Sequence, residues 1–172
     1  MTALDTARPA YLTSPITEPA AFKLARLAPT YDGIAFLTAI KDGELPPPPI
    51  AELLGFEIRD VERGRVTFAM RPEEKHYNPI GMVHGGVTAT LLDTVMGCAL
   101  QTTLDAGFGY STADIQVRYV RPVTLQTGTV IAEGTLLHRG RRTAVAEAKL
   151  YDEQLGRLLA TATSTLLTVE KP

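Results

Sequence analysis

One acidic residue stands alone in an apolar stretch of the sequence. Asp93 occurs in a run with helical spacing, among Leu91, Leu92, Val95 and Cys98. A carboxylate among apolar side chains costs desolvation free energy unless a partner or a reaction uses its charge. Asp93 is therefore the first candidate for a catalytic base or nucleophile. A purely structural hydrogen bond is the competing interpretation.

A turn with several potential hydrogen-bond donors precedes this acid. His84-Gly85-Gly86 stands where the helix begins, so the N–H groups of both glycines lack partners within the helix and lie at the positive end of its dipole. Such N–H groups suit a carbonyl oxygen that gains negative charge during a reaction. Asn78 can add a side-chain donor to the same oxygen, or it can simply begin a turn with Pro79. His84 can cap the helix, orient the loop or carry a proton.

Small and polar residues accompany the acid along one side of the helix. The stripe at helical spacing consists of Gly86, Thr90, Asp93, Gly97 and Gln101. A glycine inside a helix costs roughly 1 kcal/mol relative to alanine. Two explanations stand side by side: a ligand or a second chain approaches the helix backbone here, or the glycines permit tight packing of the helix on a sheet.

A basic cluster stands at a predicted turn between two strands and consists of His138, Arg139, Gly140, Arg141 and Arg142. The planar guanidinium group of arginine stays charged and forms paired hydrogen bonds with phosphate. The cluster indicates a phosphate-bearing ligand or, alternatively, a solvated hairpin tip. A nucleic-acid patch is disfavoured because no aromatic side chains are interleaved with the basic ones. Tyr119, on a predicted strand, is a further binding candidate.

The hydrophobic pattern predicts the elements that position these residues. A proline-containing lead-in over residues 1–29, with a short helical piece at 20–27, precedes a helix over 31–41 and a helical turn at 50–54. The remaining predicted elements are strands at 56–61 and 65–70, a long helix at 83–104, and strands at 112–120, 128–138, 143–152 and 157–169. This order predicts an α+β fold in which an antiparallel sheet wraps around a central helix.

Composition narrows the class of protein. The chain has 172 residues, 45% of them hydrophobic, and a net charge of −2, which suits one globular domain. A single cysteine excludes an intrachain disulfide, and no residues have zinc-ligand spacing, so no metal is expected. The near balance of 17 basic and 19 acidic residues argues against a nucleic-acid partner. Without a signal-peptide pattern or a membrane-spanning segment, a cytoplasmic location away from the membrane is expected.

Several motifs, taken in order, resemble one known family. They are Asn78-x-x-Gly81-x-x-His84-Gly85-Gly86, Leu92-Asp93 with Gly97 beyond it, the segment 109–122, Gly140-Arg-Arg-Thr143 and the segment 152–160. Together they resemble the PaaI-type hotdog-fold acyl-CoA thioesterases over roughly residues 50–169. The resemblance divides the chain into an N-terminal extension, 1–49, partly extended with one helix, and a hotdog thioesterase domain, 50–169.

The resemblance also implies roles for particular residues. Asp93 corresponds to the family's general base or nucleophile, while Asn78 and the Gly85 N–H correspond to the groups that polarise the thioester carbonyl. Thr112 corresponds to the hydroxyl residue that helps hold the attacking water, and Ser111, one position before it, is the alternative. The basic cluster corresponds to the region beside the nucleotide and phosphates of coenzyme A. Coenzyme A enters as part of the substrate, and no cofactor is expected.

The resemblance implies an assembly as well. In the hotdog families two protomers pair their sheets edge to edge, and the active site lies between one protomer's helix N-terminus and its neighbour's acid. The strand predicted at 112–120 contains no proline or lysine that would guard its edge. We therefore expect a homodimer at least and, by the same resemblance, a homotetramer.

Two other functions are compatible with the same motifs. A hotdog hydratase or dehydratase would pair an acid with a catalytic histidine, and His84 is the candidate. An acyl-CoA sensor would use the pocket for binding without turnover. The acyl group itself is open between aromatic and medium-chain types, with Met82, Met96, Leu100 and Phe36 as expected pocket walls.

Overall fold

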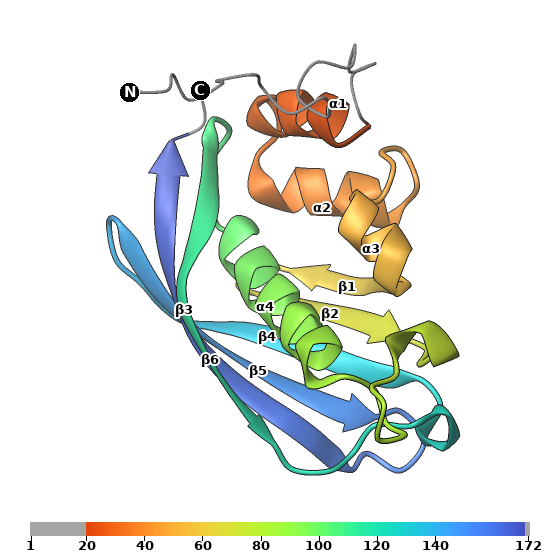
Figure 1. The fold of residues 1–172 in the computed structure, drawn as a ribbon. Helices are drawn as coiled ribbons and strands as arrows, with labels where there is room; N and C mark the ends of the chain where they lie inside the picture. Colours follow the sequence, from red (N-terminus) through yellow and green to blue (C-terminus); the bar gives the residue numbers. More distant parts are fainter. Residues whose placement is uncertain (1–19, 171–172) are drawn as a thin grey trace, which may run out of the picture.

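A single long helix lies across the concave face of one sheet (Figure 1). The computed structural model describes the backbone of residues 20–170. The helix is α4 (Gly85–Gln101), and the strands are β1 (Phe56–Glu62), β2 (Arg65–Met70), β3 (Phe108–Tyr119), β4 (Val130–Arg139), β5 (Thr143–Asp152) and β6 (Leu158–Glu170). They pair antiparallel in the order β1-β2-β4-β5-β6-β3. The predicted α+β hotdog fold is confirmed.

The core forms where α4 meets small side chains of the sheet. Leu91, Leu92, Val95 and Met96 have no exposed surface, and fully burying a side chain of this kind contributes roughly 1.5–3 kcal/mol. The facing residues of β5 and β6 include Ala144, Ala146, Ala148, Ala160 and Ala162, all at most 1% exposed. On β4, a Cβ atom at Gly134 would lie 2.3 Å from the Val95 carbonyl oxygen. Small residues in the sheet thus allow the helix to lie unusually close to it.

α4 is shorter at both ends than its hydrophobic pattern predicted. Val83, expected to be helical, instead forms a β-bridge with Tyr77 and donates its N–H to Val123 O at 2.9 Å. At the other end, Thr102 is the C-cap, and its N–H bonds to the carbonyl of Cys98. At the N-terminal end the cause is tertiary, because the Val83 N–H bonds to Val123 in place of a further helical turn.

The N-terminal extension packs at the C-terminal end of α4. Its helices are α1 (Ala20–Leu27) and α2 (Gly33–Lys41), followed by α3 (Pro49–Leu54). They confirm the short helical piece predicted at 20–27, the helix predicted over 31–41 and the helical turn predicted at 50–54. Of the lead-in predicted over residues 1–29, residues 1–19 lie outside the described residues. Gly33 donates its N–H to Leu104 O at 2.9 Å, and a Cβ atom at Gly33 would lie 1.6 Å from Gln101 O. Only glycine allows α2 to approach α4 so closely.

β3 is an edge strand that carries a bulge. Its one neighbour is β6, and the register shifts between Thr112 and Asp114, leaving Ala113 as the extra residue. β3 begins at Phe108, four residues before the predicted start. A bulge bends the strand and redirects its side chains, so the predicted alternation does not hold across this point.

No helix within residues 20–170 is both long and apolar enough to cross a membrane.

Candidate functional site

Asp93 has a specific partner on the edge strand. The Thr112 hydroxyl donates a hydrogen bond of 2.9 Å to Oδ1 of Asp93. Both side chains are partly buried, and the bulge at Ala113 follows Thr112 directly. The adjacent Ser111 is exposed, so the structure selects Thr112 of the two hydroxyl residues. The acid is held in one orientation and still has an oxygen to accept a proton.

The glycine one turn beyond the acid makes room for a strand side chain. A Cβ atom at Gly97 would lie 2.1–2.4 Å from atoms of the Tyr110 side chain. Burial, together with the nearby Cys98 and Asp93, raises the pKa of Tyr110 well above its usual value. Gly97 therefore supports the packing explanation of the small-residue stripe, and a neutral phenol lies beside the acid. Sequence reasoning missed Tyr110, although its place just before the Ser111-Thr112 pair was a usable signal.

The start of α4 is capped by its own histidine. His84 is the N-cap, and its Nδ1 accepts the Gly86 N–H at 2.9 Å. The Gly85 N–H has no recorded acceptor anywhere in the described chain. Of the two glycine donors predicted for an oxyanion, Gly85 therefore stays available and Gly86 is used by the cap.

The side-chain oxygen of Asn78 stabilises a turn. Its Oδ1 accepts the N–H groups of Ile80 at 3.1 Å and Met82 at 3.2 Å. The Nδ2 group has no recorded acceptor among the described residues, and Asn78 lines the same pocket as Gly85. The turn interpretation is confirmed, and the donor interpretation stays compatible with it because it uses the other atom of the side-chain amide.

That pocket has a volume of about 350 Å³ and lies at the N-terminal end of α4. Tyr119 lines it and donates its hydroxyl to the Gly85 carbonyl at 2.8 Å. Met82 lines it as expected, whereas Met96 and Leu100, two other expected wall residues, are fully buried in the core. The pattern was misleading there because both residues project from α4 toward the sheet.

A buried histidine supports the loop that carries Asn78. His76 is 1% exposed, its Nδ1 accepts the Glu73 N–H at 3.0 Å, and its carbonyl accepts the His84 N–H at 2.7 Å. Its Nε2 is buried without a partner in the described structure. Burial, reinforced by Lys75 and opposed by Glu73, lowers the pKa of His76. This residue was not singled out from the sequence because a lone histidine carries no distinctive spacing.

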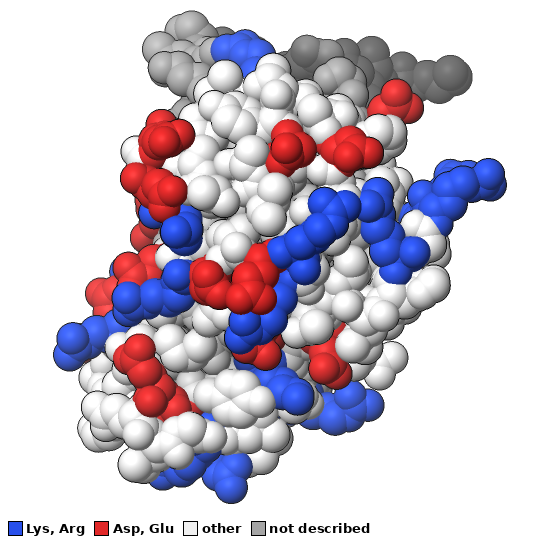
Figure 2. Space-filling view, turned by 180° about the vertical axis from the view of Figure 1, so that it is seen from behind, with Lys and Arg blue, Asp and Glu red and all other residues white. Residues whose placement is uncertain are grey.

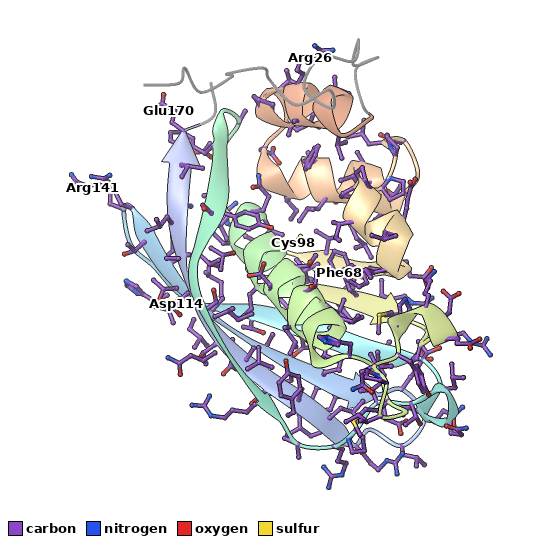
Figure 3. All side chains as sticks on the ribbon, viewed as in Figure 1. Arg26, Phe68, Cys98, Asp114, Arg141 and Glu170 are labelled. Atoms are coloured by element: carbon purple, nitrogen blue, oxygen red, sulfur yellow. The ribbon has the colours of Figure 1, made fainter. Side chains whose placement is uncertain are left out.

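The basic cluster lies at the other end of α4 from this pocket. Arg139 donates to Thr103 O, just beyond the end of α4, at 2.5 Å, while Arg141 points away from the molecule (Figure 3). His138 and Arg142 are exposed, and Gly140 forms the hairpin turn with Thr143. Seen from behind, basic side chains gather on the side where β4 ends and β5 begins (Figure 2). Arg139 thus has a structural partner, and Arg141 and Arg142 present their charge to solvent.

One chain does not bring the acid and the donors together. Asp93 and Gly85 are eight residues apart on α4, which separates their backbones by about 12 Å at 1.5 Å per residue. A single carbonyl group cannot contact both at that separation. Nowhere in the described part of the chain do three His, Cys, Asp or Glu side chains cluster as metal ligands would.

The sequence of this chain is similar to those of known proteins. Residues 80–158 match the family model described as the thioesterase superfamily. The chain is similar to acyl-coenzyme A thioesterase 13 of Homo sapiens, with 36% identity over 97 residues that cover 56% of this chain and 68% of that protein.

Solved structures agree in fold. A phenylacetic acid degradation-related protein of Ralstonia eutropha superposes with a TM-score of 0.69 and 31% identity, covering 76% of this chain and 98% of that one. A Streptococcus mutans protein solved with bound acetyl CoA has a TM-score of 0.61 and 30% identity, covering 67% of this chain and 90% of that one.

The lowered pKa of His76 leads to a prediction about stability. The folded state disfavours the proton, so as the pH falls below the ordinary histidine value of about 6.5 the unfolded state binds it first. The free energy of unfolding should therefore decrease between about pH 8 and about pH 5.5, and less so in His76→Gln, which cannot titrate. Urea denaturation at each pH measures this. The exposed His138→Gln is the matched control and should keep the wild-type decrease; an equal decrease in wild type and His76→Gln would refute the prediction.

Proposed function

The chain belongs to the thioesterase superfamily, and from its membership we propose that it hydrolyses an acyl-CoA thioester to the free acid and coenzyme A at a site shared between two copies of the chain. Acyl-CoA thioester hydrolysis is the activity named for its relative acyl-coenzyme A thioesterase 13. The observation that carries the proposal is the orientation of Asp93 by Thr112, with the Gly85 N–H left unpaired at the start of the same helix.

The proposed mechanism depends on where negative charge develops during the reaction. When oxygen attacks the thioester carbon, negative charge develops on the carbonyl oxygen, and the Gly85 N–H and Asn78 Nδ2 stabilise that oxygen more than the neutral ground state. The C–S bond then breaks and the coenzyme A thiolate leaves. These steps involve only side chains and amides of the protein, the thioester and water.

Asp93 can take part in two ways. As a general base it accepts a proton from water held by Thr112, and the resulting hydroxide adds to the carbonyl carbon. As a nucleophile its carboxylate attacks first, forming a mixed anhydride that water then hydrolyses. The hydrogen bond from Thr112 suits both versions, since it leaves the second carboxylate oxygen without a recorded donor in the described chain.

The distance between Asp93 and Gly85 within one chain supports a homodimer. The free edge of β3 is the natural pairing surface, because an edge strand presents unpaired N–H and C=O groups. Pairing β3 with a second copy would bring Asp93 and Thr112 of one chain toward Gly85 and Asn78 of the other. A homotetramer remains a prediction from the family resemblance.

The phosphates of coenzyme A are assigned to the basic cluster. Arg141 and Arg142 are exposed and suited to phosphate, whereas Arg139 is engaged by the carbonyl of Thr103. The Streptococcus mutans relative, solved with acetyl CoA, supports binding of a coenzyme A ester by this fold.

Removing the carboxylate tests the assigned role of Asp93. Asp93→Asn keeps the size of the side chain but removes the base, so thiol release from a panel of acyl-CoAs should fall by about 10²- to 10⁴-fold. Asp105→Asn, an exposed acid just beyond α4, is the matched control and should leave release unchanged. Binding without thiol release by the wild type would favour the sensor, and loss of double-bond absorbance without release would favour the hydratase.

Heavy-oxygen water distinguishes the two roles of Asp93. In a single turnover a pure general base places the label only in the product acid, whereas hydrolysis of a mixed anhydride can place it in the Asp93 carboxylate. Mass spectrometry of the peptide that contains residue 93 measures this. Labelled Asp93 would reject the general-base version, and the Asp93→Asn peptide serves as the background.

Mixing two inactive variants tests whether the site is shared. Asn78→Asp keeps the oxygen that accepts the Ile80 and Met82 N–H groups and loses the Nδ2 donor, so it should lose about 10²- to 10³-fold in activity. Co-refolding it with Asp93→Asn should restore about a quarter of wild-type activity, since half the dimers are mixed and each mixed dimer has one intact site. No recovery despite mixed dimers in native mass spectrometry would contradict a shared site.

A further inference from the structure

A second pocket lies on the flank of α4, away from the Gly85 pocket. It has a volume of about 300 Å³, and the N-terminal extension forms part of its wall. Its walls include Ile40 of α2, Ile50 of α3, Phe56 of β1 and Phe68 of β2, and Thr94 and Cys98 of α4 form its floor. Figure 3 labels Cys98 and Phe68 on the two elements that face each other here. Only the floor falls within residues 80–158, which match the family model.

The floor of this pocket presents no unmet polar group. The Thr94 hydroxyl donates to the Thr90 carbonyl at 2.7 Å, within the helix. Burial raises the pKa of Cys98 to about 12, which keeps the thiol neutral. A ligand group lying here meets no charge and no unpaired polar atom of the floor, so the floor suits hydrocarbon.

The charged residues at the rim are already paired. Lys41 bonds Asp42 at 3.0 Å, and Glu57 bonds Arg59 at 2.8 Å. These four side chains are at least one-third exposed and lie in solvent. The pocket therefore has an apolar interior and a solvent-exposed, charged rim, as sites for partly apolar small molecules do.

The pocket adjoins the acid proposed for catalysis. Thr94 follows Asp93 directly on α4, so the carboxylate lies on the neighbouring flank of the helix, about 100° around its axis. A thioester carbonyl held beside Asp93 could extend its acyl group along the helix surface into the pocket. The volume is about twice the roughly 150 Å³ of an apolar protein cavity that admits benzene.

We propose that this pocket binds the apolar acyl tail of the substrate, either a straight chain of about eight carbons or an arylacetyl group, and that α2, α3 and the link between them set acyl specificity. The inference rests on the proposed function, since it assigns the acyl end of the same substrate. Ile50, which lines the pocket, is 45% exposed and would be covered by the bound tail.

A series of CoA esters tests the assignment in the wild-type protein. Initial rates of thiol release from acetyl-, butyryl-, octanoyl-, dodecanoyl- and phenylacetyl-CoA give kcat/KM for each. Each methylene that enters the pocket should raise kcat/KM by about fourfold, up to a chain of about eight carbons. Preference for octanoyl-CoA over phenylacetyl-CoA would indicate the straight chain, and the reverse would indicate the arylacetyl group.

Two variants reshape the pocket in opposite directions. Ala51→Leu fills it and should lower the octanoyl-to-acetyl ratio of kcat/KM by about tenfold, while Ala35→Leu, on an exposed part of α2, should leave that ratio unchanged. Ile50→Ala enlarges it and should raise the dodecanoyl-to-octanoyl ratio. Leu53→Ala is the matched control, because Leu53 is on the same helix, 65% exposed and outside the pocket lining.

The outcomes separate the two proposals. A wild-type protein that releases thiol from none of the esters would overturn the proposed function. A protein that releases thiol from every ester without favouring octanoyl- or phenylacetyl-CoA over acetyl-CoA would overturn the pocket assignment alone. An unchanged octanoyl-to-acetyl ratio in a folded Ala51→Leu variant would also overturn the pocket assignment. If Ala51→Leu fails to fold, an unchanged dodecanoyl-to-octanoyl ratio in Ile50→Ala overturns it instead, because the exposed position of Ile50 tolerates truncation.

Discussion

The close approach of α4 to the sheet is the constraint on which the other features depend. At two points the contact leaves no space for a Cβ atom: Gly134 of β4 faces the helix backbone at Val95, and Gly97 of α4 faces the ring of Tyr110. Because packed interiors transmit small displacements, the position of α4 against β3 also decides whether the Thr112 hydroxyl reaches Asp93. Gly97 lowers the intrinsic stability of the helix, but its lack of a side chain allows the close contact with Tyr110 of β3 that positions Asp93.

The two ends of α4 differ in how their backbone groups are covered and hydrogen-bonded. The C-terminal end is covered by the extension and by Arg139, whose guanidinium bonds the carbonyl of Thr103. The N-terminal end is capped by His84, which uses the Gly86 N–H and leaves the Gly85 N–H open at a pocket. Because the Gly85 N–H is unpaired and lies at the positive end of the helix dipole, the N-terminal end of α4 suits an anionic or polarised oxygen, whereas the C-terminal end is already covered. Asp93 sits mid-helix, too far from that oxygen to contact it within its own chain, and this separation is the physical reason why we propose a site shared by two copies.

The N-terminal extension does more than bury the end of the helix. With Gly33 against Gln101, α2 is fixed in place, and α3 follows it beside β1. Together these helices place apolar side chains along the flank of α4, next to Asp93. In the proposed function, Asp93 and the acyl pocket lie on adjacent faces of one helix, so that the same rigid element would position both the reacting carbonyl and the acyl tail.

Local patterns in the sequence determined the six strands, the central helix and the acid that interrupts its apolar run, because hydrophobic periodicity and glycine or proline breaks act over a few residues. They also marked Gly85 and Asn78 as donors. The tertiary structure alone decided which atoms stay free: the bulge at Ala113 turns Thr112 to Asp93, the cap consumes Gly86, and Arg139 is taken up by the end of α4. Met96 and Leu100 became core and the pocket beside Cys98 opened for the same reason, since contacts between residues distant in sequence depend on how the elements pack.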